Sequence, residues 1–509
     1  MDAIDVLKQK VLTLAIQGKL VPQNPSDEPA SELLKKIKAE KEALVKAGKI
    51  KKDKQESYIY KGSDNTHYEK NGLETKDITE EIPFEIPENW EWVRLGSICN
   101  LWDNVRKPLN AKERQKKYKS GKLLYPYYGA TGQVDAIDQY IFDGEYILLG
   151  EDGAPFLDRY ATKAYKATGK FWVNNHAHIL STDISVNYLI FCLNITNYKN
   201  YVAGTTRLKL TQSDMVQIPI PLPPLSEQER IVREIEKIFA EIEVVKENQA
   251  ELSKLKDGLK NKILDLAIQG KLVEQDPNDE PASVLLEKIK AEKQELIKQG
   301  KIKKDKQESY IFKGADNRHY EKIGSETKDI TDEIPFQIPK NWAWVRLNQL
   351  GSIIGGGTPK TEIKENWENG SIPWLTPADM KYIKGKYVSE GARNITPKGL
   401  STSSAMLMSA NSIVYSSRAP IGYIAITQNA LCTNQGFKSL EPFNSKIIGF
   451  IYYALIALTD DIKSRASGTT FKEISGSEFG QTMIPLPPLS EQQRIVEKIE
   501  KLNKYIKNL

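Results

Sequence analysis

Basic side chains gather in one stretch of the sequence, beside aromatic and small polar residues. Residues 106–122 hold eight lysines and arginines and one acidic residue, Glu113, and the string YPYYGATG follows at 125–132. Cations of this kind hold phosphates, and polar loop residues beside them can discriminate bases. The combination favours DNA binding, although charge alone is equally typical of a solvated lysine-rich loop.

Two later segments offer the same chemistry. AGTTRLKLTQSDM at 203–215 and ASGTTFKEISGSEF at 466–479 each place Gly-Thr-Thr before a basic residue. GGGTPKT and YSSRAPIG add further hydroxyl and basic groups in the second half of the chain. From residue type and expected loop placement we predict DNA contacts at Arg106, Lys107, Arg114, Lys116, Lys117, Tyr128, Thr131, Thr206, Arg207, Lys209, Thr358, Lys360, Arg418, Thr470 and Lys472.

The motifs of common catalytic sites are missing from the sequence. It contains no P-loop, no dinucleotide-binding G-x-G-x-x-G and no amino-methyltransferase tetrapeptide, and GGGTPK at 355–360 has the spacing of a turn. His176 and His178 alternate as in a strand without acidic or cysteine ligands nearby in the sequence, so we expect no metal site. GEDGAPFLD at 150–158 lacks the lysine that would complete a nuclease motif. We therefore predict no catalytic residue and expect a binding protein.

Length and composition limit the class of protein. A chain of 509 residues needs several domains, and a net charge of +5 is compatible with a polyanionic ligand. Three widely spaced cysteines and the lack of a long apolar run or signal sequence lead us to expect a cytoplasmic protein without membrane spans.

The chain is an internal duplication with unlike inserts. Residues 7–95 align without a gap to residues 259–347, with 68 identities in 89 positions. Beyond them the two copies diverge until PLPPLSEQ recurs, at 221–228 and 485–492. Nearly identical segments suit two copies of one partner, and divergent inserts suit two different targets. Simple drift after a duplication is the alternative.

Each PLPPLSEQ string predicts the start of a helix. Ser226 and Ser490 are the expected N-caps, with Glu229 and Gln493 completing capping boxes. Apolar residues then recur in a heptad pattern over roughly 35 residues after Ser226, which predicts a coiled-coil helix. The C-terminal copy stops early, and the N-terminus continues its phase, so the two chain ends together resemble a second such helix. We predict that they pack antiparallel to the unbroken helix in a pseudo-twofold molecule; two independent surface helices are the alternative.

Between helix and insert, each repeat contains a charged amphipathic helix and then a polar stretch of some 25 residues. This stretch lacks clear periodicity, so we expect an extended arm. Both inserts mix short β-type runs, such as YILLG, FWVNN, SIVYSS and YIAIT, with turns and a few helices, which indicates an α+β fold class.

Several strings resemble the specificity (S) subunit of type I restriction-modification enzymes: PLPPLSEQ-x-RIV, LAIQGKLV, IPF-x-IP-x-NW-x-WV-x-L, YYGATG, NNHAH and TNQGF. The resemblance covers essentially the whole chain. It implies two target recognition domains, each reading half of a bipartite DNA site, separated by a long coiled coil. The predicted boundaries are 1–21 and 487–509 (terminal half-helices), 22–88 and 274–340 (arms), 89–222 and 341–486 (recognition domains) and 223–273 (central helix).

The resemblance also implies partners. Two methyltransferase (M) subunits would bind the repeated helices, restriction (R) subunits would complete the nuclease, and double-stranded DNA would be the ligand. S-adenosylmethionine, ATP and Mg²⁺ would be bound by the partner subunits and no cofactor by this chain. An orphan or silent specificity cassette, or a coiled-coil scaffold that gathers two identical partners without DNA, remains an alternative.

Overall fold

The computed structural model describes residues 3–48, 57–117, 123–304, 308–468 and 472–509, with the side chain of Lys117 excepted. The chain divides into two compact units, Met1–Gln249 and Ala250–Leu509, and each contains one copy of the repeat. The finer domain boundaries given above stay predictions. None of the described helices combines the length and the apolar character that crossing a membrane requires.

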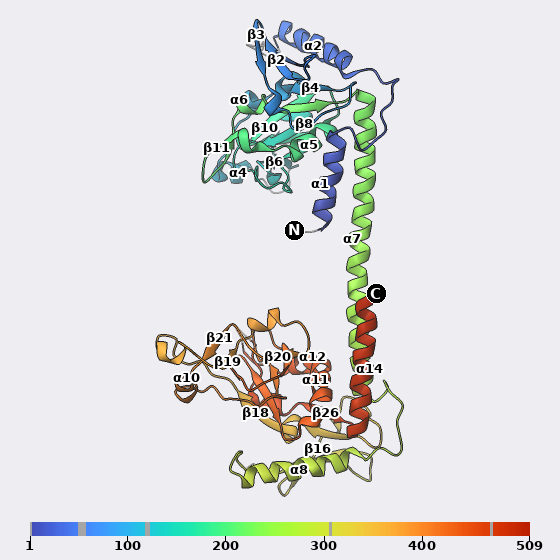
Figure 1. Ribbon diagram of the computed structural model, residues 1–509, viewed down its shortest axis with the longest axis vertical. Helices are drawn as coiled ribbons and strands as arrows, with labels where there is room; N and C mark the ends of the chain where they lie inside the picture. The colour runs from blue at the N-terminus through green and yellow to red at the C-terminus, as the bar shows by residue number, and fades with distance from the viewer. Residues whose placement is uncertain (1–2, 49–56, 118–122, 305–307, 469–471) are drawn as a thin grey trace. The chain divides into compact units, whose positions relative to one another are not determined.

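A six-stranded sheet forms the body of the first unit (Figure 1). Its strand order is β5-β10-β8-β9-β6-β7, and neighbouring strands are antiparallel except for the parallel pair β6 and β9. The predicted strands YILLG and FWVNN contribute to β8 and β9. The strands are β5 (Cys99–Leu101), β6 (Tyr125–Tyr128), β7 (Gln133–Ile137), β8 (Phe142–Gly150), β9 (Ala164–Val173) and β10 (Ala177–Thr182), and helix α5 (Val186–Ile195) packs on them.

The second unit has a different insert of the same general class. A five-stranded sheet in the order β18-β25-β22-β23-β20 is joined by a three-stranded sheet in the order β21-β19-β24. The predicted strands SIVYSS and YIAIT contain β22 and β23. The elements are β18 (Gly351–Gly355), β19 (Ile372–Leu375), β20 (Tyr387–Val388), β21 (Arg393–Ile395), β22 (Ile413–Tyr415), β23 (Ile424–Thr427), β24 (Cys432–Thr433), β25 (Lys438–Pro442) and helix α11 (Ile448–Ala457).

A short strand pair closes each insert at its two ends. β4 (Glu91–Arg94) pairs with β13 (Pro219–Leu222), and β17 (Ala343–Arg346) pairs with β26 (Met483–Leu486) in the matching register. The remaining short elements are α3 (Leu95–Ile98), α4 (Ala111–Lys117), β11 (Val202–Ala203), β12 (Lys209–Leu210), α6 (Gln212–Met215), α9 (Leu347–Leu350), α10 (Pro397–Ser401), α12 (Thr459–Ser464) and α13 (Gly476–Gly480).

The extended arm expected from the polar stretch is wrong, because much of that stretch folds into a sheet in both repeats. Ile59 is buried against Trp92 of β4, which gives the sheet an inner face. Amphipathic helices α2 (Ala30–Lys46) and α8 (Ala282–Lys298) precede the sheets, as predicted. The arm strands are β1 (Ser57–Lys61), β2 (His67–Asn71), β3 (Glu74–Asp77), β14 (Ser309–Lys313), β15 (His319–Ile323) and β16 (Glu326–Asp329).

The predicted helix after the first PLPPLSEQ is confirmed as α7 (Leu225–Ile268), 44 residues long. In the first unit, α1 (Ala3–Ile16) lies beside it, and Lys8 Nζ is 2.6 Å from Glu243 Oε1. In the second unit, α14 (Leu489–Asn508) packs on α11. The long helix and two mixed α and β domains therefore match the expected fold class, and the coiled-coil pairing of the chain ends stays a prediction.

The predicted caps Ser226 and Ser490 are wrong. Helices α7 and α14 begin one residue earlier, at Leu225 and Leu489. Each serine therefore lies in the first turn, and its hydroxyl donates to an aspartate of the Pro/Asp-rich loop, Ser226 to Asp27 and Ser490 to Asp279.

A buried glutamate fixes each helix start to the repeat. Glu227 is fully buried and accepts hydrogen bonds from Trp90 Nε1 (3.0 Å) and Gln23 Nε2 (2.6 Å). Burial raises the pKa of Glu227 above its ordinary value. Glu491 accepts from Trp342 Nε1 (2.8 Å) and Gln275 in the same way. The same residue types therefore make the same hydrogen bonds at both helix starts, and we call each of these glutamate-centred contacts a joint.

Candidate DNA-recognition surface

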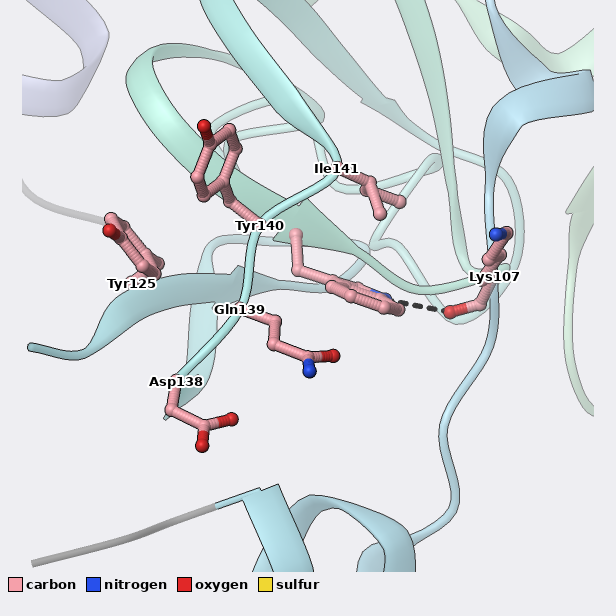
Figure 2. A pocket seen from close by; sticks show the side chains of 7 residues that line it. Lys107, Tyr125, Asp138, Gln139, Tyr140 and Ile141 are labelled. Atoms are coloured by element: carbon pink, nitrogen blue, oxygen red, sulfur yellow. Dashed lines mark hydrogen bonds between the residues drawn. The ribbon is translucent and has the colours of Figure 1, made fainter. Parts of the chain in front are cut away.

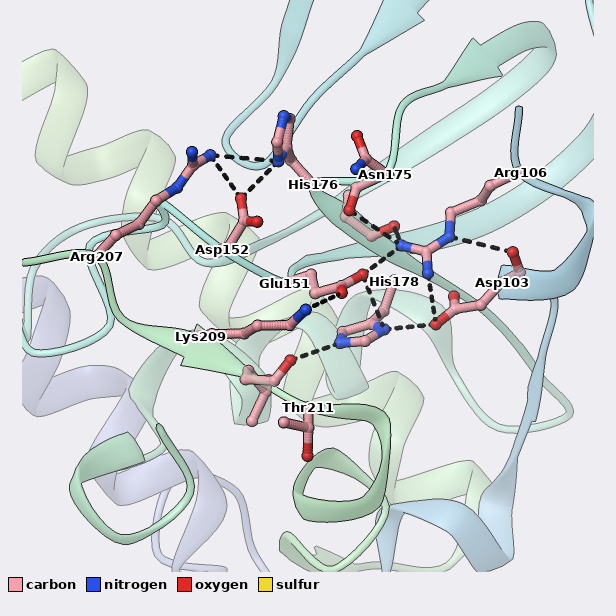
Figure 3. A network of polar contacts seen from close by, with 12 residues as sticks. Asp103, Arg106, Glu151, Asp152, Asn175, His176, His178, Arg207, Lys209 and Thr211 are labelled. Atoms are coloured by element: carbon pink, nitrogen blue, oxygen red, sulfur yellow. Dashed lines mark hydrogen bonds and ion pairs between the residues drawn. The ribbon is translucent and has the colours of Figure 1, made fainter. Parts of the chain in front are cut away.

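Charged residues from four separate segments meet beside the six-stranded sheet of the first unit (Figure 3). Glu151 follows β8, His178 lies on β10, Arg106 follows β5, and Lys209 begins β12. Arg106 Nη1 is 2.5 Å from Glu151 Oε2, and Lys209 Nζ is 3.2 Å from Glu151 Oε1. One carboxylate therefore holds two of the predicted DNA-contacting cations.

His178 is the buried centre of this cluster, with 1% of its side chain exposed. Its Nδ1 lies 2.6 Å from Asp103 Oδ2, and its Nε2 lies 3.0 Å from the carbonyl oxygen of Leu210. Both ring nitrogens therefore lie within hydrogen-bond distance of oxygen atoms, which fixes the orientation of the ring. Burial works to raise the pKa of Asp103, but the hydrogen bond and charge of His178 outweigh it and lower that pKa.

Asp103, Glu151 and His178 offer ligand atoms within 4.8 Å of one another, the kind of cluster that can hold a metal ion. The same two carboxylates are already paired with Arg106, Lys209 and the His178 ring. A cation entering the cluster would have to displace these partners. The donor set therefore fits a charge-balanced ion-pair network better than a metal site.

Arg207 forms the outer edge of the cluster. Its Nη2 lies 2.6 Å from Asp152 Oδ1, and 58% of its side chain is exposed. Lys209 is similarly exposed, at 53%. Both side chains are thus oriented by inner carboxylates while their charges stay accessible, an arrangement that suits contact with phosphate oxygens.

Arg106 differs from these two cations. Besides Glu151 it approaches Asp103 (3.3 Å) and donates to the carbonyl of Ala177 (2.8 Å), and only 14% of its side chain is exposed. Its guanidinium is thus occupied within the domain. The DNA contact at Arg106 stays a prediction that would require these contacts to be exchanged.

The basic helix α4 and its surroundings form a second region. Arg114 donates to Asp135 (2.8 Å) and to the carbonyl of Leu109 (2.9 Å), and it lies over the ring of Tyr127. Lys116 is exposed. Lys117 ends the helix, and its side chain lies outside the described residues.

Beside this region lies an open hollow of about 400 Å³ (Figure 2). Lys107 is one of its lining residues and also an exposed one. The Lys107 carbonyl accepts a hydrogen bond from Trp172 Nε1 at 2.7 Å, which fixes one wall. Tyr125 and Tyr140 form another wall, with ring centroids 5.0 Å apart. Lys107 therefore sits at an aromatic-lined depression.

The other predicted residues of this domain occupy loops and the end of strand β6. Tyr128 is half-buried at a β-bulge in β6, between the rings of Tyr165 and Phe171. Thr131 and Thr206 are both exposed. Thr206 adjoins Arg207, whereas no contact among the described residues joins the side chain of Tyr128 or Thr131 to the charged cluster.

In the second unit the glycine-rich string is packed tightly. A Cβ on Gly356 would lie 1.8 Å from the carbonyl oxygen of Asn434, so no other residue fits there. The loop carries two predicted residues, Thr358 and Lys360, which are both exposed, and the Thr358 hydroxyl donates to Gln435. The glycine-rich loop, which follows β18, therefore contacts the TNQGF segment.

The remaining predicted residues of the second unit lie elsewhere on it. Arg418 is 3.4 Å from Glu473, and Lys472 is exposed beside that glutamate in sequence. Thr470 lies outside the described residues. The structure thus brings Arg418 close to the 472–473 segment, but no described contact joins them to Lys360.

Sequence reasoning missed the acidic members of the charged cluster. Asp103, Glu151 and Asp152 each bind a cation that was predicted to contact DNA. In the sequence, GEDG and NNHAH are separate strings, and neither completes a nuclease motif or a metal site. The adjacent Glu151 and Asp152 and the alternating His176 and His178 are the available signal, but only the pairing of β8 with β10 brings them together.

Comparison with known proteins agrees with this two-part organisation. The family model for the type I restriction modification DNA specificity domain matches residues 87–254 and again 339–509. The EcoAI specificity subunit of Escherichia coli is 28% identical over 581 residues, which cover 98% of this chain and 89% of that protein. The Escherichia coli EcoEI specificity subunit is 30% identical over 412 residues, covering 70% of this chain and 63% of that protein.

The fold has a counterpart among solved structures. A chain from a structure describing complex assembly and conformational transition of the type I R-M system has a TM-score of 0.50 at 19% identity. The match covers 84% of this chain and 93% of that one. With the family model on both halves of the chain, these findings show that the protein belongs to the family of type I restriction-modification specificity subunits.

Proposed function

We propose that this chain selects the DNA sequence on which a type I restriction-modification enzyme acts. Each recognition domain would read one half of a bipartite site in double-stranded DNA. The observation that carries the proposal is that the DNA specificity family matches the chain twice, at 87–254 and 339–509. Specificity subunits are the non-catalytic subunits of their enzymes, so adenine methylation and cleavage would belong to other chains.

The two half-sites should differ from each other. The inserts lie between matching strand pairs, yet their sheets have different strand orders and numbers. Different loops present different donors and acceptors to base edges. The whole site should therefore be asymmetric, not a palindrome.

The duplicated segments would hold two identical methyltransferase subunits, and restriction subunits would join that complex. The identical joints at Glu227 and Glu491 support the idea of one docking geometry repeated twice. S-adenosylmethionine, ATP and Mg²⁺ would be bound by those partners. A cytoplasmic location follows from the action of such an enzyme on DNA.

A coiled coil would set the distance between the half-sites. Along α7, Val245, Leu252 and Leu259 are exposed apolar residues in the heptad pattern that begins with the buried Ile231 and Ile235. Exposed apolar positions that recur along one side of a helix favour a helical partner. The helices at the two chain ends are the partners that we propose.

Genome-wide mapping of N6-methyladenine in the host, with and without this gene, tests the proposal. We expect a bipartite, asymmetric motif with a fixed gap that disappears when the gene is deleted. An unchanged methylation pattern, in a strain that expresses the partner subunits, would contradict it. The affinity of the purified chain for DNA should fall steeply between about 50 and 200 mM salt. An affinity that does not fall would instead favour a coiled-coil scaffold that does not act on DNA.

A further inference from the structure

Among the described residues of the second recognition domain, Arg393 is the exposed arginine for which no carboxylate partner is found. The other arginines described in 341–486 have carboxylates within 4.0 Å: Arg346 with Glu321 and Glu333, Arg418 with Glu473, and Arg465 with Asp461 and Glu478. For Arg393, no ion pair or side-chain hydrogen bond is found among the described residues, and its side chain is exposed. It was absent from the residues predicted to contact DNA.

The guanidinium of Arg393 is nevertheless held in place. Its Cζ lies 3.7 Å from the centre of the Trp367 ring. At this distance a cation is attracted to the face of the indole, and stacking uses the guanidinium's flat face. The edges, which carry the five N–H donors, remain available to a ligand.

Trp367 is itself a fixed platform. Its Nε1 donates to the carbonyl of Lys360 at 3.1 Å, and its ring meets Trp374 edge-on with centroids 5.0 Å apart. Trp374 is buried, donates to the carbonyl of Gly357 at 2.9 Å and pairs across the sheet with Arg393. The arginine is thus aligned by contacts that reach back to the glycine-rich loop.

The position of this group within the second unit suits contact with a large ligand. Arg393 lies on β21, and the strands β19 and β21 with α10 lie on the side of the unit away from α14 (Figure 1). Lys360, whose carbonyl anchors Trp367, is exposed at the same platform. An exposed lysine and an oriented arginine fork therefore belong to the same group of contacts.

We propose that Arg393 reads a guanine in the half-site of the second domain, through two hydrogen bonds from its fork to the guanine O6 and N7 atoms. Phosphate binding needs only a nearby positive charge, whereas a guanine edge needs a planar fork of fixed orientation, and Trp367 supplies that orientation. The inference rests on the proposed function and deepens it by naming a specificity-determining residue. Trp367 acts through Arg393 as a positioning residue.

Selection of bound sequences from a pool of random DNA duplexes tests the proposal with the full chain. Wild-type protein should select a motif containing a G·C pair in the second half-site. Arg393→Ala and Arg393→Lys should both lower the preference at that one pair roughly 10- to 100-fold, because lysine keeps the charge but not the fork. Trp367→Leu should weaken the same preference partially.

Matched controls make the outcome decisive. Lys364→Ala removes an exposed cation three residues from Trp367 and should leave the preference for every base pair unchanged. The first half-site within each selected motif reports whether a variant still folds and binds. An unaltered motif with Arg393→Ala, or a uniform loss of affinity with that variant, would mean that Arg393 does not read a base pair and would overturn the assignment. A wild-type chain that selects no motif would overturn the proposed function itself.

Discussion

At the scale of single residues, each arm is fixed by a buried arginine shared between two glutamates. Arg94 Nη2 lies 2.6 Å from Glu69 and 2.8 Å from Glu81, and only 5% of its side chain is exposed. Burial works to raise the pKa of Glu69 and of Glu81, but the hydrogen bonds that they accept, from Arg94 among others, lower both below 4.5. Arg346 repeats the arrangement with Glu321 and Glu333.

Replacing Arg94 by methionine should reverse the pH dependence of this network. With depressed pKa values, the glutamates stabilise the wild-type unit fully above pH 4.5 and lose that contribution only below it. Without Arg94, burial is opposed only by the remaining partners Ser57 and Lys76, so the pKa values of both glutamates rise. The variant should lose about 3 kcal/mol of unfolding free energy at pH 7, near the lower limit for a broken buried pair because 32% of Glu81 is exposed.

That deficit should shrink between pH 7 and pH 5, as the carboxyls take up protons more readily in the folded variant. Urea unfolding of wild type and variant at both pH values measures it. Arg318→Met is the matched control, since Arg318 is 63% exposed and should change stability little. If the loss of unfolding free energy stays the same at pH 7 and pH 5, the protonation of Glu69 and Glu81 does not contribute to it.

The same scale shows why the candidate site was only partly predictable. Charge and residue type singled out Arg207 and Lys209, which are exposed, but also Arg106 and Arg114, which pair with Glu151 and Asp135. Those carboxylates lie 45 and 21 residues further along the chain, so only the fold brings them to the cations. Arg393 was missed for the converse reason, because its platform residue Trp367 is distant in sequence.

At the scale of elements, LAIQGKLV encodes the end of a helix. After α1, Gly18 donates to the carbonyl of Ala15 (3.1 Å) and Lys19 to that of Leu14 (2.8 Å), which is the Schellman arrangement. Gly18 has φ +66°, and a Cβ there would lie 2.4 Å from Pro87 Cγ. Gly270 repeats this geometry against Pro339, so the string joins each helix to its repeat.

Two glycine substitutions can distinguish the cost of a left-handed backbone from the cost of crowding a Cβ against Pro87. Gly48 ends α2 with φ +68° but has no atom within 4 Å of the Cβ position. Gly48→Ala should therefore cost about 1 kcal/mol of unfolding free energy from the left-handed backbone alone. Gly18→Ala should cost about 1–3 kcal/mol more from crowding. Thermal or urea unfolding would measure both, and equal losses would contradict close packing at Pro87.

Elements were predicted well where the pattern of apolar or β-type residues was clear and poorly where it was weak. The heptad pattern predicted α7, and short runs of β-type residues predicted strands in YILLG and YIAIT. The arm sheet was missed because β3 is exposed at every position, which leaves no alternation to detect. The serine caps failed because prolines already start the helices, and each hydroxyl instead meets a loop aspartate some 200 residues away.

At the scale of the whole molecule, the two inserts are supported by matching strand pairs and matching helix faces. Arg94 donates to the carbonyl of Gln217 across the first strand pair, and Arg346 donates to that of Gln481 across the second. The helix faces beneath the inserts also match, because Ile231 and Ile235 are fully buried, as are Ile495 and Ile499. An insert moved from one unit to the other should therefore pack against the same kind of strand pair and helix face.

A chain in which residues 96–216 replace residues 348–480 would hold two copies of the first insert. We expect it to fold, since both strand pairs and both helix faces are kept, and to read the first half-site twice. A pseudo-twofold molecule places the copies in opposite orientations, so the selected DNA motif should become an inverted repeat. A direct repeat, with the folded state confirmed by circular dichroism, would show independent readout but reject the pseudo-twofold pairing of the chain ends. A folded chimera that reads only one half-site would reject the independence of the two domains.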